Sequence, residues 1–311
     1  MKTKILVTGG AGFVGSNLVK KLVNQGYDVN VLDNLSKGRL NYLDGLDVNV
    51  FEADIRDPKA CESAFTGVQK VVHLAAYGSV VESVDDPRAN FEMNVLGTFN
   101  VLNLAVQAEV EKLVFSSTGG ALIGNAIPPV SEASLPKPIS PYGAGKLCCE
   151  AYCNAFSESY GLNTICLRFA NVYGPNSLHK VGVINKFVQR LMAKKPLTIF
   201  GDGSSTRDYI HVSDLCNGIF LAIENDEIKN DVIHIATGKE TSLKELADMF
   251  LEIDGGDQPS IEFKPSRVGE VERNFALYDY ASQKLGYQPK VDLKDGLAET
   301  IQYLRNHYEV E

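Results

Sequence analysis

The sequence lacks the features that would direct a protein to a membrane or to a nucleic acid. It has no uninterrupted apolar run of about 18 residues or more and no cleavable signal, so we expect no membrane partner. Its 39 acidic residues outnumber its 30 basic ones, and a net charge of −9 argues against a nucleic-acid partner. That charge still permits a local basic pocket for an anionic small molecule.

Cysteine is also sparse, and its spacing is not that of a metal site. The chain has six cysteines, and Cys148, Cys149 and Cys153 fall on one predicted helix. We interpret these three as small core residues and expect no bound metal. Free thiols and the missing signal indicate the reducing cytoplasm. The 311 residues suffice for one large domain or two closely joined ones.

The first motif is a glycine-rich turn between an apolar strand at residues 5–7 and an amphipathic helix. Its glycines follow the spacing G-x-x-G-x-x-G, a relative of the dinucleotide-binding fingerprint. Such a turn aims free backbone N–H groups at an anion before the helix N-terminus. The residues expected to contact a dinucleotide here are Gly9, Gly12, Phe13, Val14 and Gly15.

An acidic residue follows at the expected distance. The second predicted strand, residues 27–32, ends in Asp33, about 20 residues past the glycines. A carboxylate there can accept hydrogen bonds from both ribose hydroxyls of adenosine and would repel a 2′-phosphate. The pair of motifs therefore predicts NAD rather than NADP. The alternative is that Asp33 is a loop or capping acid.

Two later strands also end in residues suited to a cofactor. Asp54 and Ile55 follow a strand at 48–52, where the acid can accept the adenine amino group and the isoleucine can pack on the ring. Alternatively, Asp54 or, more readily, Asp57 caps the next helix. The strand beginning at Lys70 ends in small apolar residues that let a cofactor approach the backbone, namely Leu74, Ala75 and Ala76.

Two polar residues in or near that strand can be interpreted as structural. His73 lies within the strand and is interpreted as a core histidine with satisfied hydrogen bonds. Asn94 lies within a long predicted helix at 88–107. Its amide can serve the cofactor or can hold a neighbouring loop.

The fifth strand, residues 112–118, leads through a proline-rich loop into Tyr142-x-x-x-Lys146. Residues at i and i+4 lie on one helical face. The ammonium of Lys146 can hold the nicotinamide ribose and lower the pKa of the Tyr142 phenol, which can then act as a general base. A hydroxyl of Ser117 or Thr118 can share the substrate oxygen, and Thr118 is favoured. An exposed helix pair is the alternative explanation.

In this order the motifs resemble the extended short-chain dehydrogenase/reductase family, and within it the nucleotide-sugar epimerases and dehydratases. Further matching segments are Asp33-Asn-Leu, Ser116-Ser-Thr118, residues 168–175 and residues 207–211, so the resemblance covers essentially the whole chain. It adds Asn34 and Ser116 to the expected cofactor contacts.

The resemblance implies an α/β fold. We expect a Rossmann doubly wound parallel sheet of about seven strands and a smaller C-terminal α/β substrate-binding domain. The NAD-binding domain would span residues 1–175, with 208–250 returning to it, and the nucleotide-sugar-binding domain would comprise 176–207 and 251–311. By the same resemblance, helices 88–107 and 143–160 would form a homodimer, although their apolar faces could equally be buried within one chain.

The resemblance also implies a UDP-sugar substrate. Asn171 and Arg207 would bind the diphosphate, although Arg207 could instead pair with Asp208 or Asp214. Arg267 and Glu270 would complete the nucleotide site. Some family members place a bulky tyrosine where this chain has Asn274, which leaves room for a 2-acetamido group.

The residues after Thr118 bear on which reaction the family resemblance implies. Dehydratases of the family carry an Asp-Glu pair there, whereas this chain has Gly119 and Gly120. The expected activity is therefore a 4-epimerase of UDP-hexoses (UDP-Glc/UDP-Gal, with UDP-GlcNAc/UDP-GalNAc as further substrates) acting through a transient 4-keto sugar. The alternatives are a UDP-glucuronate 4-epimerase, another nucleotide-sugar oxidoreductase, or a non-catalytic NAD-binding regulator, which would usually lack the Tyr-Lys pair.

Overall fold

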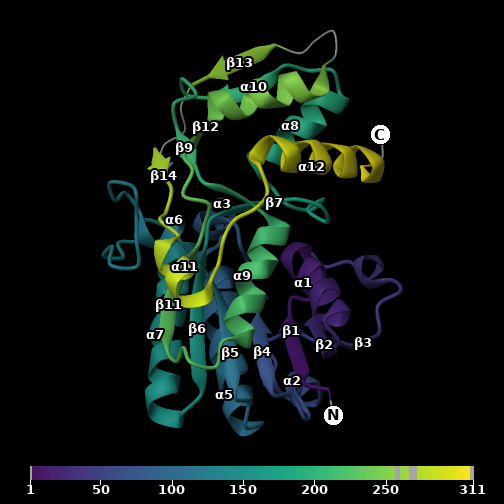
Figure 1. The fold of residues 1–311 in the computed structure, drawn as a ribbon, viewed down its shortest axis with the longest axis vertical. Coiled ribbons are helices and arrows are strands. Elements are labelled where there is room, and N and C mark those ends of the chain that lie inside the picture. The colour runs from purple at the N-terminus through teal and green to yellow at the C-terminus, as the bar shows by residue number, and fades with distance from the viewer. Residues whose placement is uncertain (1, 256–259, 266–271, 309–311) are drawn as a thin grey trace.

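A seven-stranded parallel sheet forms the centre of the computed structural model, which describes residues 2–255, 260–265 and 272–308. Its strand order is β11-β6-β5-β4-β1-β2-β3 (Figure 1). The strands are β1 (Lys4–Thr8), β2 (Asp28–Asp33), β3 (Val48–Glu52), β4 (Lys70–His73), β5 (Lys112–Thr118), β6 (Asn163–Phe169) and β11 (Asp231–Ile235). This sheet confirms the predicted fold class.

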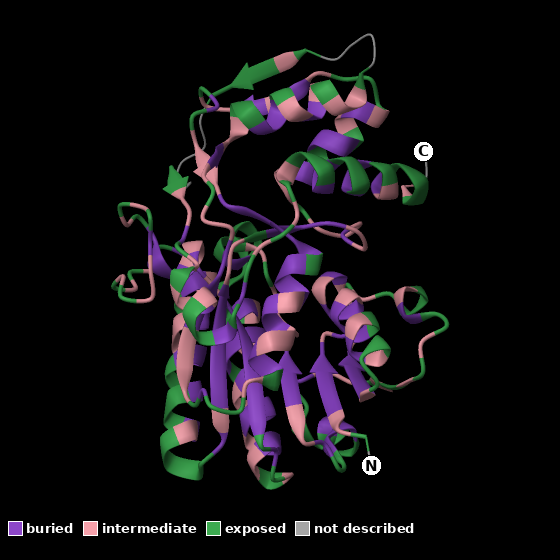
Figure 2. Ribbon diagram, viewed as in Figure 1, coloured by how far each residue is buried: buried purple, intermediate pink, exposed green. Residues whose placement is uncertain are grey.

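Helices cover both faces of the sheet. Along β1, Ile5 and Val7 pack into one hydrophobic cluster and Leu6 into another, because successive side chains of a strand point to opposite faces. Helices α1 (Phe13–Asn24) and α9 (Val212–Glu224) complete the first cluster, and α5 (Gly97–Gln107) and α7 (Pro141–Tyr160) the second. The inner strands are buried along most of their length (Figure 2), and burial on both faces explains apolar runs such as residues 5–7.

The predicted helix at 88–107 is not one regular α-helix. Helix α4 (Pro87–Phe91) passes into a π-helical segment at Glu92–Leu96 before α5 begins. Asn94 lies in this widened turn, and its amide bonds to the backbone of Tyr77. The predicted long helix at 88–107 is therefore confirmed, and it contains one π-helical segment.

The last part of the chain forms a smaller layer above the sheet in the view of Figure 1. A third hydrophobic cluster joins α8 (Val183–Met192), α10 (Leu243–Asp254) and α12 (Leu293–His307). Helix α10 begins with a capping box between Ser242 and Glu245. The small sheets beside it contain β8 (Leu197–Phe200) with β13 (Ile261–Lys264), β7 (Asn171–Tyr173) with β10 (Tyr209–His211), and β12 (Thr241–Ser242), β9 (Thr206–Arg207) and β14 (Arg273–Asn274).

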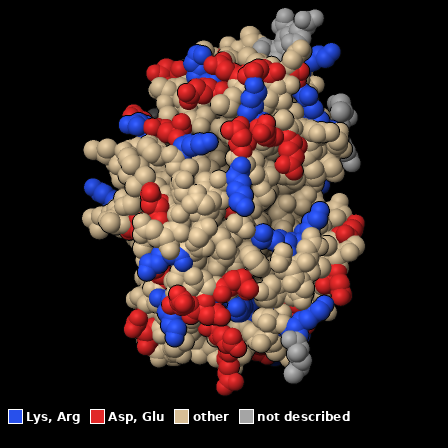
Figure 3. Space-filling model, in the orientation of Figure 1, with Lys and Arg blue, Asp and Glu red and all other residues tan. Residues whose placement is uncertain are grey.

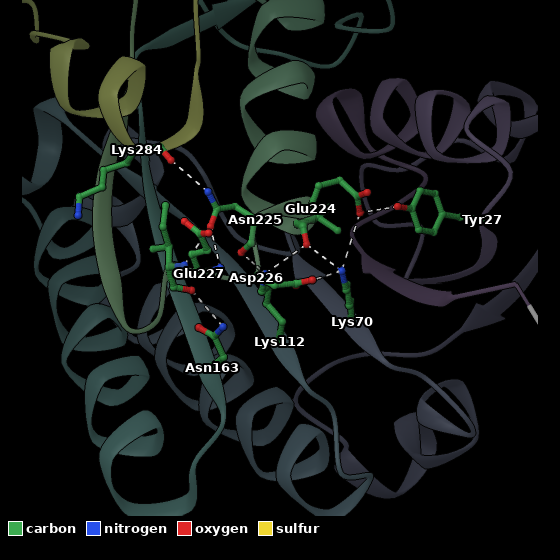
Figure 4. Close-up of polar contacts among 11 residues, drawn as sticks. Tyr27, Lys70, Lys112, Asn163, Glu224, Asn225, Asp226, Glu227 and Lys284 are labelled. Atoms are coloured by element: carbon green, nitrogen blue, oxygen red, sulfur yellow. Dashed lines mark hydrogen bonds and ion pairs between the residues drawn. The ribbon is translucent and has the colours of Figure 1, made fainter.

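The amino ends of β4 and β5 are tied to the end of α9 by two lysines (Figure 4). Lys112 Nζ donates to the carbonyls of Ile223 and Asn225 and lies 3.2 Å from Asp226 Oδ1. Lys70 Nζ donates to the same Ile223 carbonyl at 3.0 Å. Cations suit the negative end of a helix dipole, so the lysines hold α9 onto the edge of the sheet opposite the strands' carboxyl ends.

The surface carries charged side chains of both signs. On the face drawn in Figure 3, basic and acidic side chains are interspersed. Among the described residues, no helix combines the length and the apolar character needed to cross a bilayer.

Candidate active site and cofactor cleft

A deep cleft opens at the carboxyl edge of the sheet, between the glycine turn, the ends of β2 to β5, the start of α7 and the loop before α8. Of the residues predicted to bind cofactor or to act in catalysis, those that line it are Gly9, Gly12, Phe13, Val14, Gly15, Asp33, Asn34, Ile55, Leu74, Ala75, Ala76, Ser116, Ser117, Tyr142 and Lys146. Asp54, Asn94 and Thr118 are adjacent to this lining. The fold thus brings together motifs that are separated by more than a hundred residues.

The glycine turn has the shape that a dinucleotide requires. A Cβ on Gly15 would lie 2.1 Å from the Gly9 carbonyl oxygen, and one on Gly9, whose φ is +68°, would lie 2.8 Å from Ala75 N. Only glycine permits this close approach of helix, turn and strand. In the described structure the N-terminus of α1 has neither a side-chain cap nor an acidic residue in its first turn. Its N–H groups therefore suit an anion such as a pyrophosphate.

The two acids predicted to bind adenosine are held differently. Asp33 is buried and accepts hydrogen bonds from Ala11 N at 3.0 Å and Leu35 N at 2.9 Å. Burial raises the pKa of its carboxyl. The Asp54 carboxylate pairs with the Arg56 guanidinium at 2.8 Å, which lowers the pKa of Asp54 to about 2. The α2 helix (Pro58–Cys61) is capped by Asp57 and not by Asp54, and a contact of Asp54 with adenine stays a prediction.

Asn94 and His73 are buried and make hydrogen bonds close to the cleft. Asn94 Oδ1 accepts from Tyr77 N at 2.8 Å, and its Nδ2 donates to Tyr77 O at 3.1 Å. In this structure the amide therefore holds the cleft-lining loop at Tyr77, and a direct contact with the cofactor stays a prediction. His73 is fully buried between the hydroxyls of Thr8 and Thr98, and burial lowers its pKa to about 3. It is a neutral core histidine, as the sequence predicts.

Tyr142 and Lys146 lie in the first turns of α7, which starts with Ser140 as its cap and Pro141. Lys146 Nζ donates to the Ser116 carbonyl at 2.6 Å and lies 6.0 Å from the centre of the Tyr142 ring. Burial lowers the pKa of Lys146 to about 8 and raises that of Tyr142 to about 12. The expectation that Lys146 lowers the pKa of Tyr142 is therefore wrong for this structure, because burial removes the phenol from water.

The two candidate hydroxyls on β5 have different surroundings. Ser117 Oγ donates to Glu150 Oε1 at 2.5 Å, and the same carboxylate holds Arg168. Thr118 is the next residue, at the more exposed end of the strand. Because the hydroxyl of Ser117 already has a buried partner, this arrangement favours Thr118 as the group that meets a substrate. The sequence analysis did not identify Glu150, although it follows Lys146 by four residues on the same helix.

Three of the residues predicted to bind the nucleotide sugar lie on the small strands. Arg207 on β9 and Asn274 on β14 are paired in register. A Cβ on Gly120 would lie 2.0 Å from Asn274 Nδ2, so the asparagine packs directly against the glycine that follows β5. Asn171 lies on β7, exposed at the edge of the same region. Arg267 and Glu270 lie outside the described residues.

The alternative role predicted for Arg207 is an ion pair with Asp208 or Asp214. Asp208 accepts hydrogen bonds from Thr237 and Gly238, and Asp214 accepts from the backbone of Lys290 and Val291. Among the ion pairs of the described ranges, neither acid is a partner of Arg207, whose Nη1 donates to the Thr206 carbonyl.

Known proteins resemble this chain over almost its full length. A family model described as the NAD dependent epimerase/dehydratase family matches residues 5–236. A putative UDP-glucose 4-epimerase of Methanocaldococcus jannaschii is 39% identical, covering 97% of this chain and 99% of the relative. The crystal structure of the UDP-glucose 4-epimerase of Thermotoga maritima with UDP-glucose is similar with a TM-score of 0.93 and 40% identity, covering 98% of this chain and 99% of that one.

Two further solved structures bear on ligands. The Thermus thermophilus UDP-glucose 4-epimerase in complex with NAD has a TM-score of 0.91 and 35% identity, covering 98% of this chain and 100% of that chain. A UDP-N-acetylglucosamine 4-epimerase of Methanobrevibacter ruminantium, in complex with UDP-N-acetylmuramic acid, has a TM-score of 0.92 and 30% identity, covering 99% of this chain and 100% of that chain.

Proposed function

This chain belongs to the NAD-dependent epimerase/dehydratase family, and we propose that it is a 4-epimerase of UDP-hexoses. The observation that carries the choice of reaction is the glycine pair after β5. In this structure the Asn274 amide occupies the space beside Gly120, with Nδ2 2.0 Å from where a Cβ would lie. The acid pair that elimination requires in dehydratases is replaced by Gly119 and Gly120, whereas the Tyr-Lys pair for proton transfer is present.

The proposed chemistry divides between cofactor and protein. When bound, NAD would supply reversible hydride transfer at C4 of the sugar, and the residues that would hold it line the cleft. Tyr142 removes the proton of the sugar 4-hydroxyl and later gives it back, as a general base and acid. Lys146, held by the Ser116 carbonyl, would stabilise by its charge the phenolate form of Tyr142 that accepts this proton. Thr118 donates to the same sugar oxygen and fixes its position.

In this proposal, residues on the small strands bind the substrate. Arg207 suits a diphosphate because a guanidinium donates two parallel charge-assisted hydrogen bonds. Asn171, Arg267 and Glu270 complete the nucleotide site in this proposal. The short side chain of Asn274 leaves room beside the sugar, so UDP-GlcNAc and UDP-GalNAc are proposed as substrates together with UDP-Glc and UDP-Gal.

We also propose that the enzyme is a homodimer. Several large apolar side chains of α4, the π-helical segment and α7 remain exposed on one side of the molecule: Phe91 is 58% exposed, Leu96 42% and Tyr152 39%. Phe99 of α5 and Tyr152 of α7 meet edge to face with ring centres 5.6 Å apart, so these two helices form one continuous surface. A second copy would bury these residues, and light scattering would measure the mass.

The test is direct. Purified protein is incubated with UDP-Glc, UDP-GlcNAc or UDP-glucuronate, and the C4 epimer is followed by NMR. We expect Tyr142→Phe to lower the rate by about 100- to 10,000-fold while NAD binding persists. Tyr160→Phe, at the far end of the same helix and 62% exposed, is the control. Loss of a sugar hydroxyl as water would indicate a dehydratase. Turnover of UDP-glucuronate alone would indicate a UDP-glucuronate 4-epimerase, and NAD binding with no turnover would indicate a regulator.

A further inference from the structure

Lys180 is a cation in the cofactor cleft that has no carboxylate partner among the described residues. It lies in the loop between β7 and α8 and lines the cleft. Its Nζ donates to the Val172 carbonyl and lies 5.7 Å from the centre of the Phe13 ring. Phe13 is the first residue of α1, directly after the glycine turn. The ammonium therefore lies beside the place where the turn offers its N–H groups.

The loop that carries Lys180 is tied to the glycine-turn helix. Asn17 Nδ2 donates to the Pro175 carbonyl at 3.1 Å, and Asn176 Nδ2 donates to Ser16 Oγ at 3.0 Å. Tyr303 of α12 donates to Asn176 Oδ1 at 2.7 Å. These contacts hold the loop against α1 from both the turn and the C-terminal helix, so the position of Lys180 relative to Phe13 is set by the fold.

Positive charge gathers at this part of the cleft although the chain as a whole carries a net charge of −9. The pKa of His179 is lowered, first by burial and then by the nearby cations Lys37, Arg39 and Lys180. Lys37 is neutralised by Glu82 at 2.9 Å, whereas burial alone shifts the pKa of Lys180, to about 8. A desolvated cation without a counter-charge is costly, and such groups are retained where a ligand supplies the anion.

We propose that Lys180 is a further cofactor-binding residue, whose ammonium pairs with the pyrophosphate of NAD opposite the N-terminus of α1. The diphosphate of a nucleotide sugar offers the same chemistry, but the contact with Phe13 places the lysine at the dinucleotide. The inference goes beyond the proposed epimerase activity and does not depend on which sugar is turned over. It depends only on NAD binding.

Titration calorimetry on protein freed of nucleotide tests this assignment. Lys180→Gln should weaken binding of NAD and of ADP-ribose by about 10-fold or more, the scale of a charge-assisted contact. Lys180→Arg should keep most of the affinity, and adenosine, which has no phosphate, should bind all variants alike. Lys186→Gln is the matched control, because it removes the same charge from an exposed position on α8.

UDP is titrated in the same way. The assignment would be overturned if Lys180→Gln bound NAD with wild-type affinity, or if the variant lost affinity for UDP alone. If Lys180→Gln does not fold, the wild-type chain gives a second measurement. ADP-ribose should slow acetylation of Lys180 but not of Lys186, as read by mass spectrometry, and unprotected acetylation of Lys180 would refute the contact. Neither readout needs turnover, so failure here differs from failure of the epimerase proposal.

Discussion

Glu150 of α7 holds the guanidinium of Arg168 on β6 through hydrogen bonds of 2.9 and 2.8 Å, with both side chains buried. The same carboxylate accepts from Ser117 of β5 at 2.5 Å. One acid thus joins the helix that carries Tyr142 and Lys146 to the two strands beside the site. The relative placement of the proposed base and Thr118 depends on this buried pair.

Removal of the acid should be strongly destabilising. Glu150→Ala leaves Arg168 buried without its counter-charge, and we expect the free energy of unfolding to fall by about 3–5 kcal/mol in urea titrations. The exposed pair Arg88–Glu92 provides the control, since Glu92→Ala should change stability by less than about 1 kcal/mol. Glu150→Leu combined with Arg168→Met should recover part of the loss. A single variant with the wild-type midpoint would contradict the role of the pair.

Lys146→Met should raise the stability of the folded protein at neutral pH and lower its turnover. Burial lowers the pKa of Lys146 from 10.5 to about 8, so between these pH values the unfolded chain holds a proton that the folded chain has released. Wild-type stability therefore rises with pH through this interval, and below it the buried ammonium costs about 1–3 kcal/mol. We expect the variant to melt higher than the wild type at pH 7, although the lost bond to the Ser116 carbonyl offsets part of the gain.

That difference should shrink as the pH approaches 10.5, where neither state of the wild type is fully charged at this residue. Thermal unfolding without ligand at pH 7 and pH 10 measures it, and turnover of UDP-Glc should be strongly reduced in the same variant. A stability difference that does not change with pH would show that the lysine is not desolvated as described.

Asn274→Tyr should narrow the range of sugars. The asparagine lies against Gly120 beside the proposed sugar site, and a tyrosine there would fill the space assigned to a 2-acetamido group. We expect kcat/KM for UDP-GlcNAc and UDP-GalNAc to fall by about tenfold or more while UDP-Glc and UDP-Gal are still turned over. Asn274→Ala, which keeps the space open, is the control. An equal loss on both pairs of sugars would count against the assignment.

Lys112→Met should lower stability without lowering the activity of the folded enzyme. The lysine is 3% exposed and bonds to two carbonyls and the Asp226 carboxylate at the edge of the sheet opposite the cleft (Figure 4). We expect a loss of about 2 kcal/mol or more, because these acceptors lose a charged donor. Lys229→Met, at an exposed position of the same edge, should have little effect. A drop in kcat for Lys112→Met would indicate coupling to the site.

The sequence by itself predicts the sheet and most of the cleft, because the signals involved are local. Parallel strands buried on both faces leave short apolar runs, and the glycine turn at Gly9 to Gly15 and the pair Tyr142–Lys146 are each contained within a few residues. The order of these segments along the chain, together with the rule that ligands bind at the carboxyl ends of parallel strands, is enough to place them at one edge.

Contacts between distant residues decided the rest. The π-helical segment forms where Asn94 bonds to Tyr77, 17 positions away, and Ser117 is bound by Glu150, 33 positions away. The pKa of Tyr142 rises rather than falls because the phenol is buried, which no local pattern reports. Lys180 is placed beside Phe13 by a loop folded back onto α1. Desolvation and long-range pairing are properties of the packed chain, so only the tertiary structure could assign them.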